Sequence, residues 1–265
     1  MVKNLLGKLN LGWMIITHIK NWKHVFFNYF GISHNEYINF KFRDGKSVKI
    51  RNVKEKEDTS GLATICEIFL MNNYCPKEMK IKQKDIIIDI GANIGVFSIY
   101  ASFKAPKGRV YSYEPFQIHY NRLLDNLRLN NLKNIFPSNL AVCKNKGKRN
   151  LFVNKECSGM HSIIFKNNSR EKMVVNCTTL EDIFKENKVK QCDFLKIDCE
   201  GAEYEIIYSS KKEILEKIKK IALEFDNIDE GEKNGFKLKK FLEKNGFEVV
   251  LKGEDQHQGI LYARR

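Results

Sequence analysis

Several patterns that would point to a ligand or a location are missing from this sequence. Its seven cysteines include no C-x-x-C pair, so their spacing encodes neither a zinc site nor a disulfide framework. Several of them lie in apolar segments, where a free cysteine behaves as a small hydrophobic residue and persists in a reducing compartment. The sequence therefore predicts no metal site and favours a cytoplasmic protein.

A long hydrophobic run is also missing near the N-terminus. The apolar stretch 11–19 is shorter than the roughly 20 residues that span a bilayer, and no small-residue cleavage site follows it. Apolar residues still recur at helical spacing from Leu11 to Phe30, and the residues between them include Lys20, Lys23 and His24. We expect residues 11–30 to dock on the domain, to contact a second subunit in a homodimer, or to make a peripheral membrane contact.

Acidic residues are too few to balance the basic ones. The chain carries 46 Lys and Arg against 32 Asp and Glu, a formal net charge of +14. Nucleic acid, an acidic membrane face and an anionic substrate are all compatible with that excess. Because the lysines are scattered, a solvated surface explains them at least as well as a binding stripe.

The length and composition allow one substantial core. With 265 residues, of which 43% are hydrophobic, the chain can form an α/β domain with an added element. We expect an N-terminal helical and hairpin elaboration over residues 1–78 and a ligand-binding domain over residues 79–265.

Strand and helix patterns alternate along the chain. Alternating polarity around Asp44-Gly45 predicts a β-hairpin, and Asp58-Thr-Ser60 can cap a helix over 61–71. Alternating β and α segments with a terminal hairpin indicate a mostly parallel sheet with an antiparallel edge. The strands expected are 86–88, 109–113, a strand from 135 to 141, 150–153, 173–177, 194–198, 219–225, 247–251 and 259–263. The helices expected are 96–103, 118–129, 179–187, 203–217 and 232–245.

The most informative stretch is the glycine-rich turn from Asp89 to Gly95, which connects a strand to a helix. A turn leaving a buried strand often needs positive φ, and a ligand pressed against backbone amides leaves no room for a Cβ atom. The spacing is G-x-x-x-G, which matches neither the dinucleotide fingerprint nor the phosphate loop. Nucleotide-phosphate ligands are therefore disfavoured.

Acidic and amide residues follow several of the predicted strands. Glu114 ends the strand 109–113 and lies about 20 residues after Gly95, the offset of a ribose-binding acid. The strand ends that we expect on one rim of the sheet are Asp89, Glu114, 139–141, 198–200 and Glu224. Clustered carboxylates repel one another unless they meet a cation or hydroxyl donors. S-adenosylmethionine, which has a sulfonium, an ammonium and a ribose, meets this requirement.

These segments together resemble the FkbM family of S-adenosylmethionine-dependent methyltransferases. The likeness covers about residues 40 to 250 and rests on D-x-G-x-N-x-G at 89–95, Y-E-P at 113–115, N-L-A-V at 139–142 and L-K-I-D-C-E-G-A-E at 195–203. Upstream, Arg51, Asp58, Glu67-Ile-Phe69 and Tyr74 also match. Cys199 departs from the family, which commonly has an aliphatic residue there.

The resemblance implies a Rossmann-like class I methyltransferase fold with a seven-stranded sheet, and S-adenosylmethionine as the cofactor. It also implies methylation of hydroxyls on sugars or polyketide-like products. The glycine turn would hold the methionine end, Glu114 the ribose and 139–141 the adenine, while Asp198 would face the reaction zone. The cofactor-binding residues that it implies are Asp89, Gly91, Ala92, Asn93, Gly95, Glu114, Asn139, Leu140, Ala141 and Asp198.

A catalytic base is needed only if the acceptor hydroxyl loses its proton in the transition state. The catalytic candidates are Asp198, Glu200 and His161, and Glu203 and Glu224 could also serve. His161 has a near-neutral reference pKa and lies in a loop that could cover the acceptor pocket. Glu200 or Glu203 could equally cap the helix that begins after Gly201.

The leading hypothesis is an S-adenosylmethionine-dependent O-methyltransferase acting on a small-molecule or glycan acceptor. An RNA methyltransferase is the alternative, favoured by the charge of +14. The sequence from Asp198 to Gly201 is not the N/D-P-P-Y/F loop associated with methylation of base amino groups, and no separate RNA-binding motif is evident. A non-catalytic nucleotide-binding or membrane-attached scaffold is disfavoured because every acidic strand end is retained.

Overall fold

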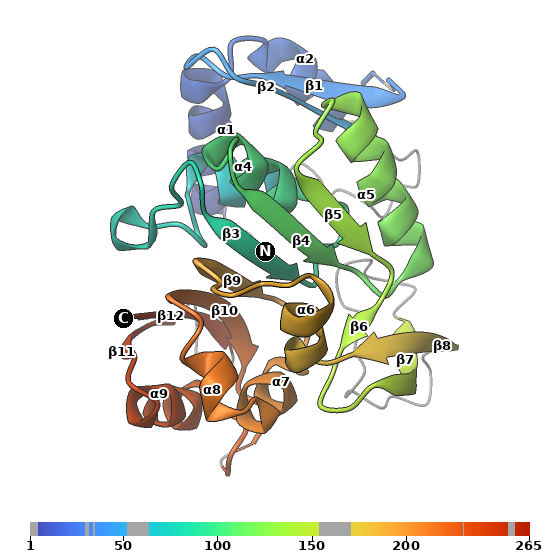
Figure 1. Ribbon diagram of the computed structural model, residues 1–265. Coiled ribbons are helices and arrows are strands. Elements are labelled where there is room, and N and C mark those ends of the chain that lie inside the picture. Colours follow the sequence, from blue (N-terminus) through green and yellow to red (C-terminus); the bar gives the residue numbers. More distant parts are fainter. Residues whose placement is uncertain are drawn as a thin grey trace.

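A seven-stranded sheet forms the centre of the molecule (Figure 1). The computed structural model describes residues 5–29, 32–33, 35–51, 64–153, 171–229, 231–253 and 258–265. The sheet order is β11-β12-β10-β9-β3-β4-β5. The strands are β3 Ile86–Ile90, β4 Arg109–Tyr113, β5 Ile135–Ser138, β9 Phe194–Ile197, β10 Lys220–Asp226, β11 Glu248–Gly253 and β12 Gln258–Arg264.

The strand directions confirm the predicted sheet. Neighbours from β10 through β9, β3 and β4 to β5 are parallel, whereas β12 runs antiparallel to both β10 and β11. The strand order reverses beside β3, because β4 and β5 lie on one side of it and β9 and β10 on the other. This is the Rossmann-like arrangement that the sequence resemblance implies, and it leaves a crevice at the carboxyl ends of β3 and β9.

Side chains of the parallel strands alternate between two hydrophobic layers. Ile87 and Val110 pack in one layer with helices α4 (Val96–Lys104) and α5 (Gln117–Leu129). Ile88 and Leu195 pack in the other. The helices of that second layer are α6 Leu180–Glu186, α7 Glu203–Ser209, α8 Lys212–Leu215 and α9 Gly235–Lys244. Because both faces are covered, the strands are apolar on both sides and the polar chemistry gathers at their ends.

The N-terminal segment packs on the first of these layers. The single helical pattern at 11–30 is divided into α1 (Leu5–His18) and α2 (Trp22–Tyr29), because Ile19 leaves the helix and bridges to Phe42. Ile15, Ile19 and Val25 are buried in the core, so the segment docks on the domain, while the Trp13 side chain stays exposed. Contact with a second subunit or a membrane stays a prediction. No helix within the described ranges is long and apolar enough to cross a bilayer.

The predicted hairpin is present as β1 (Tyr37–Lys41) and β2 (Ser47–Arg51). It is joined to α5 by two side-chain amides, since Asn130 Oδ1 accepts from Lys49 N (2.9 Å) and Asn126 Oδ1 from Arg51 N (2.7 Å). The helix expected at 61–71 is described only from Thr64 onward, where its π-helical turn is Cys66–Leu70 and a 3₁₀ turn follows at Lys77–Met79. Its expected cap at 58–60 lies outside the described residues.

Three other predicted elements have different bounds. The strand predicted to run from 135 to 141 stops at Ser138, and Ala141–Val142 form β6 in a separate three-stranded sheet ordered β6-β8-β7. Its other strands are β7 Gly147–Val153 and β8 Glu171–Thr178. The helix predicted at 203–217 is broken into α7 and α8, because Ser210 takes an extended conformation and its hydroxyl bonds Ile206 O (2.7 Å). Helix α9 begins at Gly235 rather than 232, where the Asn234 side chain accepts from Lys237 N.

Candidate functional site

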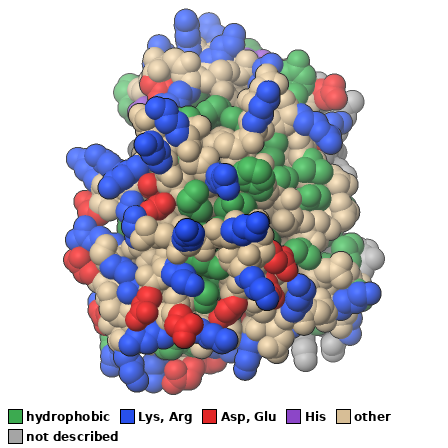
Figure 2. Space-filling view, viewed as in Figure 1, with side chains coloured by type: hydrophobic (Ala, Val, Ile, Leu, Met, Phe, Trp, Pro, Cys, Tyr) green, Lys and Arg blue, Asp and Glu red, His purple; other side chains and the backbone are tan. Residues whose placement is uncertain are grey.

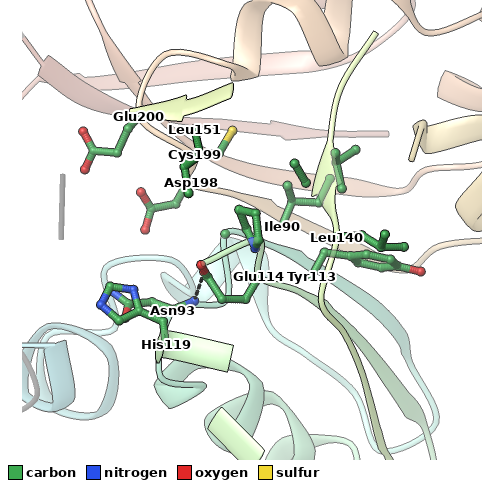
Figure 3. Close-up of a pocket in the computed structure, with 14 residues that line it drawn as sticks. Ile90, Asn93, Tyr113, Glu114, His119, Leu140, Leu151, Asp198, Cys199 and Glu200 are labelled. Atoms are coloured by element: carbon green, nitrogen blue, oxygen red, sulfur yellow. Dashed lines mark hydrogen bonds between the residues drawn. The ribbon is translucent and has the colours of Figure 1, made fainter. Parts of the chain in front are cut away.

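A pocket opens at the carboxyl ends of β3, β4 and β9, beside the point where the strand order reverses (Figure 3). Asn93, Glu114 and His119 lie on one side of it, and Asp198, Cys199 and Glu200 lie on the other. The residues that line it are Ile90, Gly91, Asn93, Tyr113, Glu114, Pro115, His119, Leu140, Ala141, Val142, Leu151, Asp198, Cys199 and Glu200. Most of the residues predicted from the sequence are therefore brought together.

The glycine turn is held against both neighbouring strands. The amides of Gly91 and Ala92 both donate to Tyr113 O at 3.0 Å, and Gly95 N donates to Ala92 O at 2.8 Å. Gly91 has φ +72°, and a Cβ atom there would come 1.7 Å from Asp198 O. Gly91 is thus required by the close approach of the β9 end, and not only by a ligand. Asn93 also has positive φ, at 50°, which asparagine tolerates better than most residues.

Glu114 is buried and already accepts two backbone hydrogen bonds. Its Oε2 accepts from Asn93 N and its Oε1 from Phe116 N, both at 2.8 Å. Burial raises the pKa of Glu114 to about 7, although these two amides work in the opposite direction. Each carboxylate oxygen has a second lone pair, so the side chain can still accept hydrogen bonds from two hydroxyls of a ligand.

The residues after β5 have two different roles: one supports the backbone and two line the pocket. The Asn139 side-chain amide donates to Glu114 O (2.9 Å) and Pro115 O (3.1 Å), and Asn139 is not among the residues that line the pocket. Leu140 and Ala141 do line it. Asn139 therefore supports the turn that carries Glu114, whereas its two successors form an apolar wall.

A buried lysine connects the ends of β3 and β9. Lys196 Nζ donates to Gly91 O at 2.7 Å and lies 3.3 Å from Asp89 Oδ1 and 3.4 Å from Asp198 Oδ2. Burial alone would lower the pKa of Lys196, but the two carboxylates outweigh it and the pKa is raised. Asp89, which is fully buried, also accepts from Ser98 Oγ at 2.5 Å. Asp89 thus fixes the turn from beneath.

A tyrosine connects Asp198 to the neighbouring strand. Tyr74 Oη lies 3.0 Å from Asp198 Oδ2 and 2.8 Å from Glu224 Oε2. Burial, followed by the two carboxylates, raises the pKa of Tyr74 well above its ordinary value. Tyr74 therefore stays protonated and its hydroxyl acts as a hydrogen-bond donor.

The two glutamates after Asp198 have different surroundings. Glu203 Oε2 accepts from Gly201 N at 2.8 Å, so this side chain binds the backbone immediately before α7. Glu200 instead lines the pocket, with φ +54°. Burial and then the negative charges of Asp198, Asp226, Glu224 and Glu203 raise the pKa of Glu200 to about 9.

Sequence reasoning missed several residues of this site. Lys196 belongs to the motif at 195–203, but a lysine inside an apolar strand gave no sign of the two carboxylates beside it. His119 is 4% exposed, packs edge-on against Phe116 and lines the pocket, and its helical position carried no signal. His161 lies outside the described residues.

A model of the methyltransferase FkbM domain matches residues 89–249, more than half of the chain. The chain belongs to the FkbM methyltransferase family. It is a methyltransferase, and the methyl donor of its family is S-adenosylmethionine.

Similar proteins include two fungal methyltransferases. Methyltransferase sdnD of Sordaria araneosa is 25% identical over 216 residues, 69% of this chain and 81% of its own length. Methyltransferase 1 of Beauveria bassiana is 22% identical over 208 residues, 71% of this chain and 82% of its own. Among solved structures, M. jannaschii TYW2 in complex with AdoMet superposes with a TM-score of 0.45 at 14% identity, covering 88% of this chain and 87% of that one.

Proposed function

We propose that this FkbM methyltransferase transfers the methyl group of S-adenosylmethionine to a hydroxyl of a sugar, glycan or small natural-product-like acceptor. The observation that carries the proposal is the character of the pocket wall beyond the glycine turn. The carboxylates of Asp198 and Glu200 line the pocket there. The Tyr74 hydroxyl contacts Asp198 and connects it to the carboxylate of Glu224. Carboxylates orient a hydroxyl by accepting its hydrogen, and they can take its proton.

The residues of the donor side fit the cofactor. Asn93 Oδ1 is buried and has no hydrogen-bond partner among the described residues, so an acceptor is available for a ligand ammonium group. Glu114 keeps acceptor capacity for the two ribose hydroxyls. Leu140 and Ala141 offer an apolar wall to the adenine, and Asp198 faces the methionine end. The carboxylates that repel one another in the free protein would meet the positive charge of the sulfonium.

The protein's part in the reaction is to position the acceptor and exclude water. S-adenosylmethionine would supply the activated methyl group, and its sulfur would be the leaving group opposite the acceptor oxygen. Because little covalent chemistry falls to the protein, correct placement of the oxygen and removal of its proton are the steps that these residues can accelerate. We assign removal of the proton to Asp198 and placement of the acceptor oxygen to Glu200, since both line the pocket and the raised pKa of Glu200 keeps its carboxyl group protonated at neutral pH. The catalytic role predicted for His161 is kept as a proposal.

RNA is disfavoured as the acceptor by the charge around the pocket. None of the described residues that line it is Lys or Arg, although binding a phosphate backbone requires such residues near the target. Figure 2 shows Lys and Arg spread over the visible face and interspersed with acidic residues, rather than gathered in one stripe. The charge of +14 is thus better explained as a solvated surface.

The experiment is transfer of a labelled methyl group from S-adenosylmethionine. The acceptors compared are hydroxylated small molecules, lipid-linked and free sugars, and total RNA, each with wild type and Glu200→Gln. We expect label in a hydroxylated acceptor as an alkali-stable methyl ether, and a rate reduced at least about 10-fold in the variant. Label in RNA alone would overturn the proposal in favour of the alternative.

A further inference from the structure

Tyr74 lies outside the matched domain and yet reaches its acidic cluster. It follows the π-helical turn of the N-terminal segment and is 7% exposed. Its ring packs edge-on against Phe97 with centroids 5.6 Å apart, and Lys196 Nζ lies 5.4 Å from the ring centre. The aromatic ring is therefore fixed, and its hydroxyl is held between Asp198 and Glu224.

The hydroxyl has one hydrogen and two carboxylates within hydrogen-bond distance. Its distances to Asp198 Oδ2 (3.0 Å) and Glu224 Oε2 (2.8 Å) are both suitable, so the hydrogen can turn to either without movement of the ring. An ionised carboxylate is the better acceptor. The direction of the hydroxyl hydrogen therefore depends on the charge of Asp198. The hydrogen is donated to Asp198 while that carboxylate is ionised, and to Glu224 once Asp198 is protonated.

The contacts to Asp198 are also one-sided. Both Tyr74 Oη and Lys196 Nζ contact Oδ2. With Oδ2 anchored, the carboxylate plane is fixed, and Oδ1 is the oxygen left for a ligand in the pocket. About a third of the side chain, 32%, is exposed, which is consistent with access from the pocket.

We propose that Tyr74 is a positioning residue for methyl transfer, anchoring Asp198 toward the acceptor and changing its hydrogen-bond partner to Glu224 when Asp198 takes the acceptor's proton. The inference rests on the proposed function. In the step, the acceptor O–H bond breaks and its proton goes to Asp198, while an O–CH₃ bond forms and the S–CH₃ bond breaks with its electron pair left on sulfur. Tyr74 keeps its own proton throughout.

Other charged groups also lie around Asp198 and influence its protonation. The lysine partner and five acids lie on the elements packed against it, and all of these side chains remain in place when the tyrosine hydroxyl is removed. The groups are Lys196, Asp89, Glu200, Glu203, Glu224 and Asp226. Cys199 beside them stays a thiol, because burial and these carboxylates raise its pKa well above the ordinary value.

The test measures the titration of Asp198 directly, by infrared spectroscopy of the full chain carrying ¹³C-labelled aspartate and saturated with S-adenosylhomocysteine. Asp198→Asn identifies the band. Loss of the hydroxyl in Tyr74→Phe should move its titration midpoint upward by about one pH unit, because an ionised carboxylate loses a donor. Glu224→Gln should move it downward, because a negative neighbour is removed and the tyrosine hydrogen stays on Asp198.

The matched control is Tyr100→Phe, which removes a buried hydroxyl from the same aromatic cluster without touching the acids, since Tyr100 Oη bonds Asn72. We expect it to leave the midpoint unchanged. Equal midpoints in wild type, Tyr74→Phe and Glu224→Gln would overturn the proposal, as would an equal shift in the control. With a hydroxyl acceptor, Tyr74→Phe should also lower kcat about 10- to 100-fold at an unchanged KM for S-adenosylmethionine. If the acceptor is not a hydroxyl, the infrared result still decides the role of Tyr74.

Discussion

The two sides of the pocket are built from different parts of the chain. On the side that we propose binds the methyl donor, called the donor side, around Gly91, Asn93 and Glu114, backbone conformation and backbone amides determine the shape. On the side that we propose binds the acceptor, called the acceptor side, around Asp198 and Glu200, side-chain carboxylates with a tyrosine and a lysine determine the charge. A side formed by backbone tolerates little variation and suits a ligand that never changes. A side formed by side chains can be altered without refolding.

Gly91→Ala, on the donor side, should have the largest effect of the four substitutions. A Cβ atom would meet Asp198 O at 1.7 Å in a conformation with φ +72°. We expect several kcal/mol of lost stability and no detectable S-adenosylmethionine binding, measured by thermal unfolding and calorimetry. The matched control is Gly45→Ala, which has φ +91° but no atom within 4 Å of the added Cβ. It should cost only about 1 kcal/mol and preserve binding. Equal losses in the two variants would show that close approach to β9 is unimportant.

Glu114→Gln should weaken the binding of S-adenosylmethionine. The amide keeps the size of the side chain but cannot accept at both oxygens, so Asn93 N or Phe116 N loses its partner. We expect about 30-fold weaker S-adenosylmethionine binding, corresponding to about 2 kcal/mol. Wild-type affinity should also rise as the pH passes through about 7, where Glu114 ionises. Glu205→Gln, which loses the ion pair to Arg149, serves as the control and should keep the wild-type affinity. An affinity independent of pH from 5 to 9 would argue against this role.

Glu200→Gln, on the acceptor side, should change how the free energy of unfolding depends on pH. Its pKa of about 9, against about 4.5 for an ordinary glutamate, means that the folded state binds an extra proton between those pH values. The free energy of unfolding of the unliganded protein should therefore fall as pH rises through this window, by at most about 1.4 kcal/mol per pH unit from this group. The variant should flatten that decline in a series of denaturant melts. If the free energies of unfolding of wild type and variant declined in parallel with pH, Glu200 would not have a raised pKa.

Asn139→Ala should have the smallest effect. Two hydrogen bonds to the backbone at 114–115 are lost, so the turn carrying Glu114 is loosened rather than removed. We expect a 3- to 10-fold weaker affinity for S-adenosylmethionine, about 1 kcal/mol. Asn130→Ala loses comparable bonds between α5 and the hairpin, far from the pocket, and should lower only the melting temperature. A loss as large as that of Glu114→Gln would mean that Asn139 touches the ligand.

The same contrast explains what the sequence could predict. Backbone demands leave strong signals, so the G-x-x-x-G turn, Glu114 and the alternation of strands and helices led to the sheet and to the donor side. Contacts between distant segments leave weak ones. Tyr74 and Glu224 are 150 residues apart in the sequence. The pairing of β10 with β9 brings Glu224 near Asp198, and Tyr74 reaches both from the N-terminal segment. Lys196 is a second case, since its burial within a strand is explained only by the two carboxylates beside it.

Some predicted boundaries of helices were wrong for a related reason. Helical periodicity continues through Ile19 and through Ser210, but pairing of Ile19 with Phe42 and back-bonding by the Ser210 hydroxyl end the helices there. Both interruptions depend on contacts that periodicity does not encode. The sequence therefore predicts the class of element better than its ends.

The most direct test of the account is calorimetric titration of S-adenosylmethionine into wild type, Glu114→Gln and Glu200→Gln at pH 8. We expect one molecule bound per chain, about 30-fold weaker binding in Glu114→Gln and an affinity within about 3-fold of wild type in Glu200→Gln. Absence of binding to wild type, or an equal loss in both variants, would contradict it.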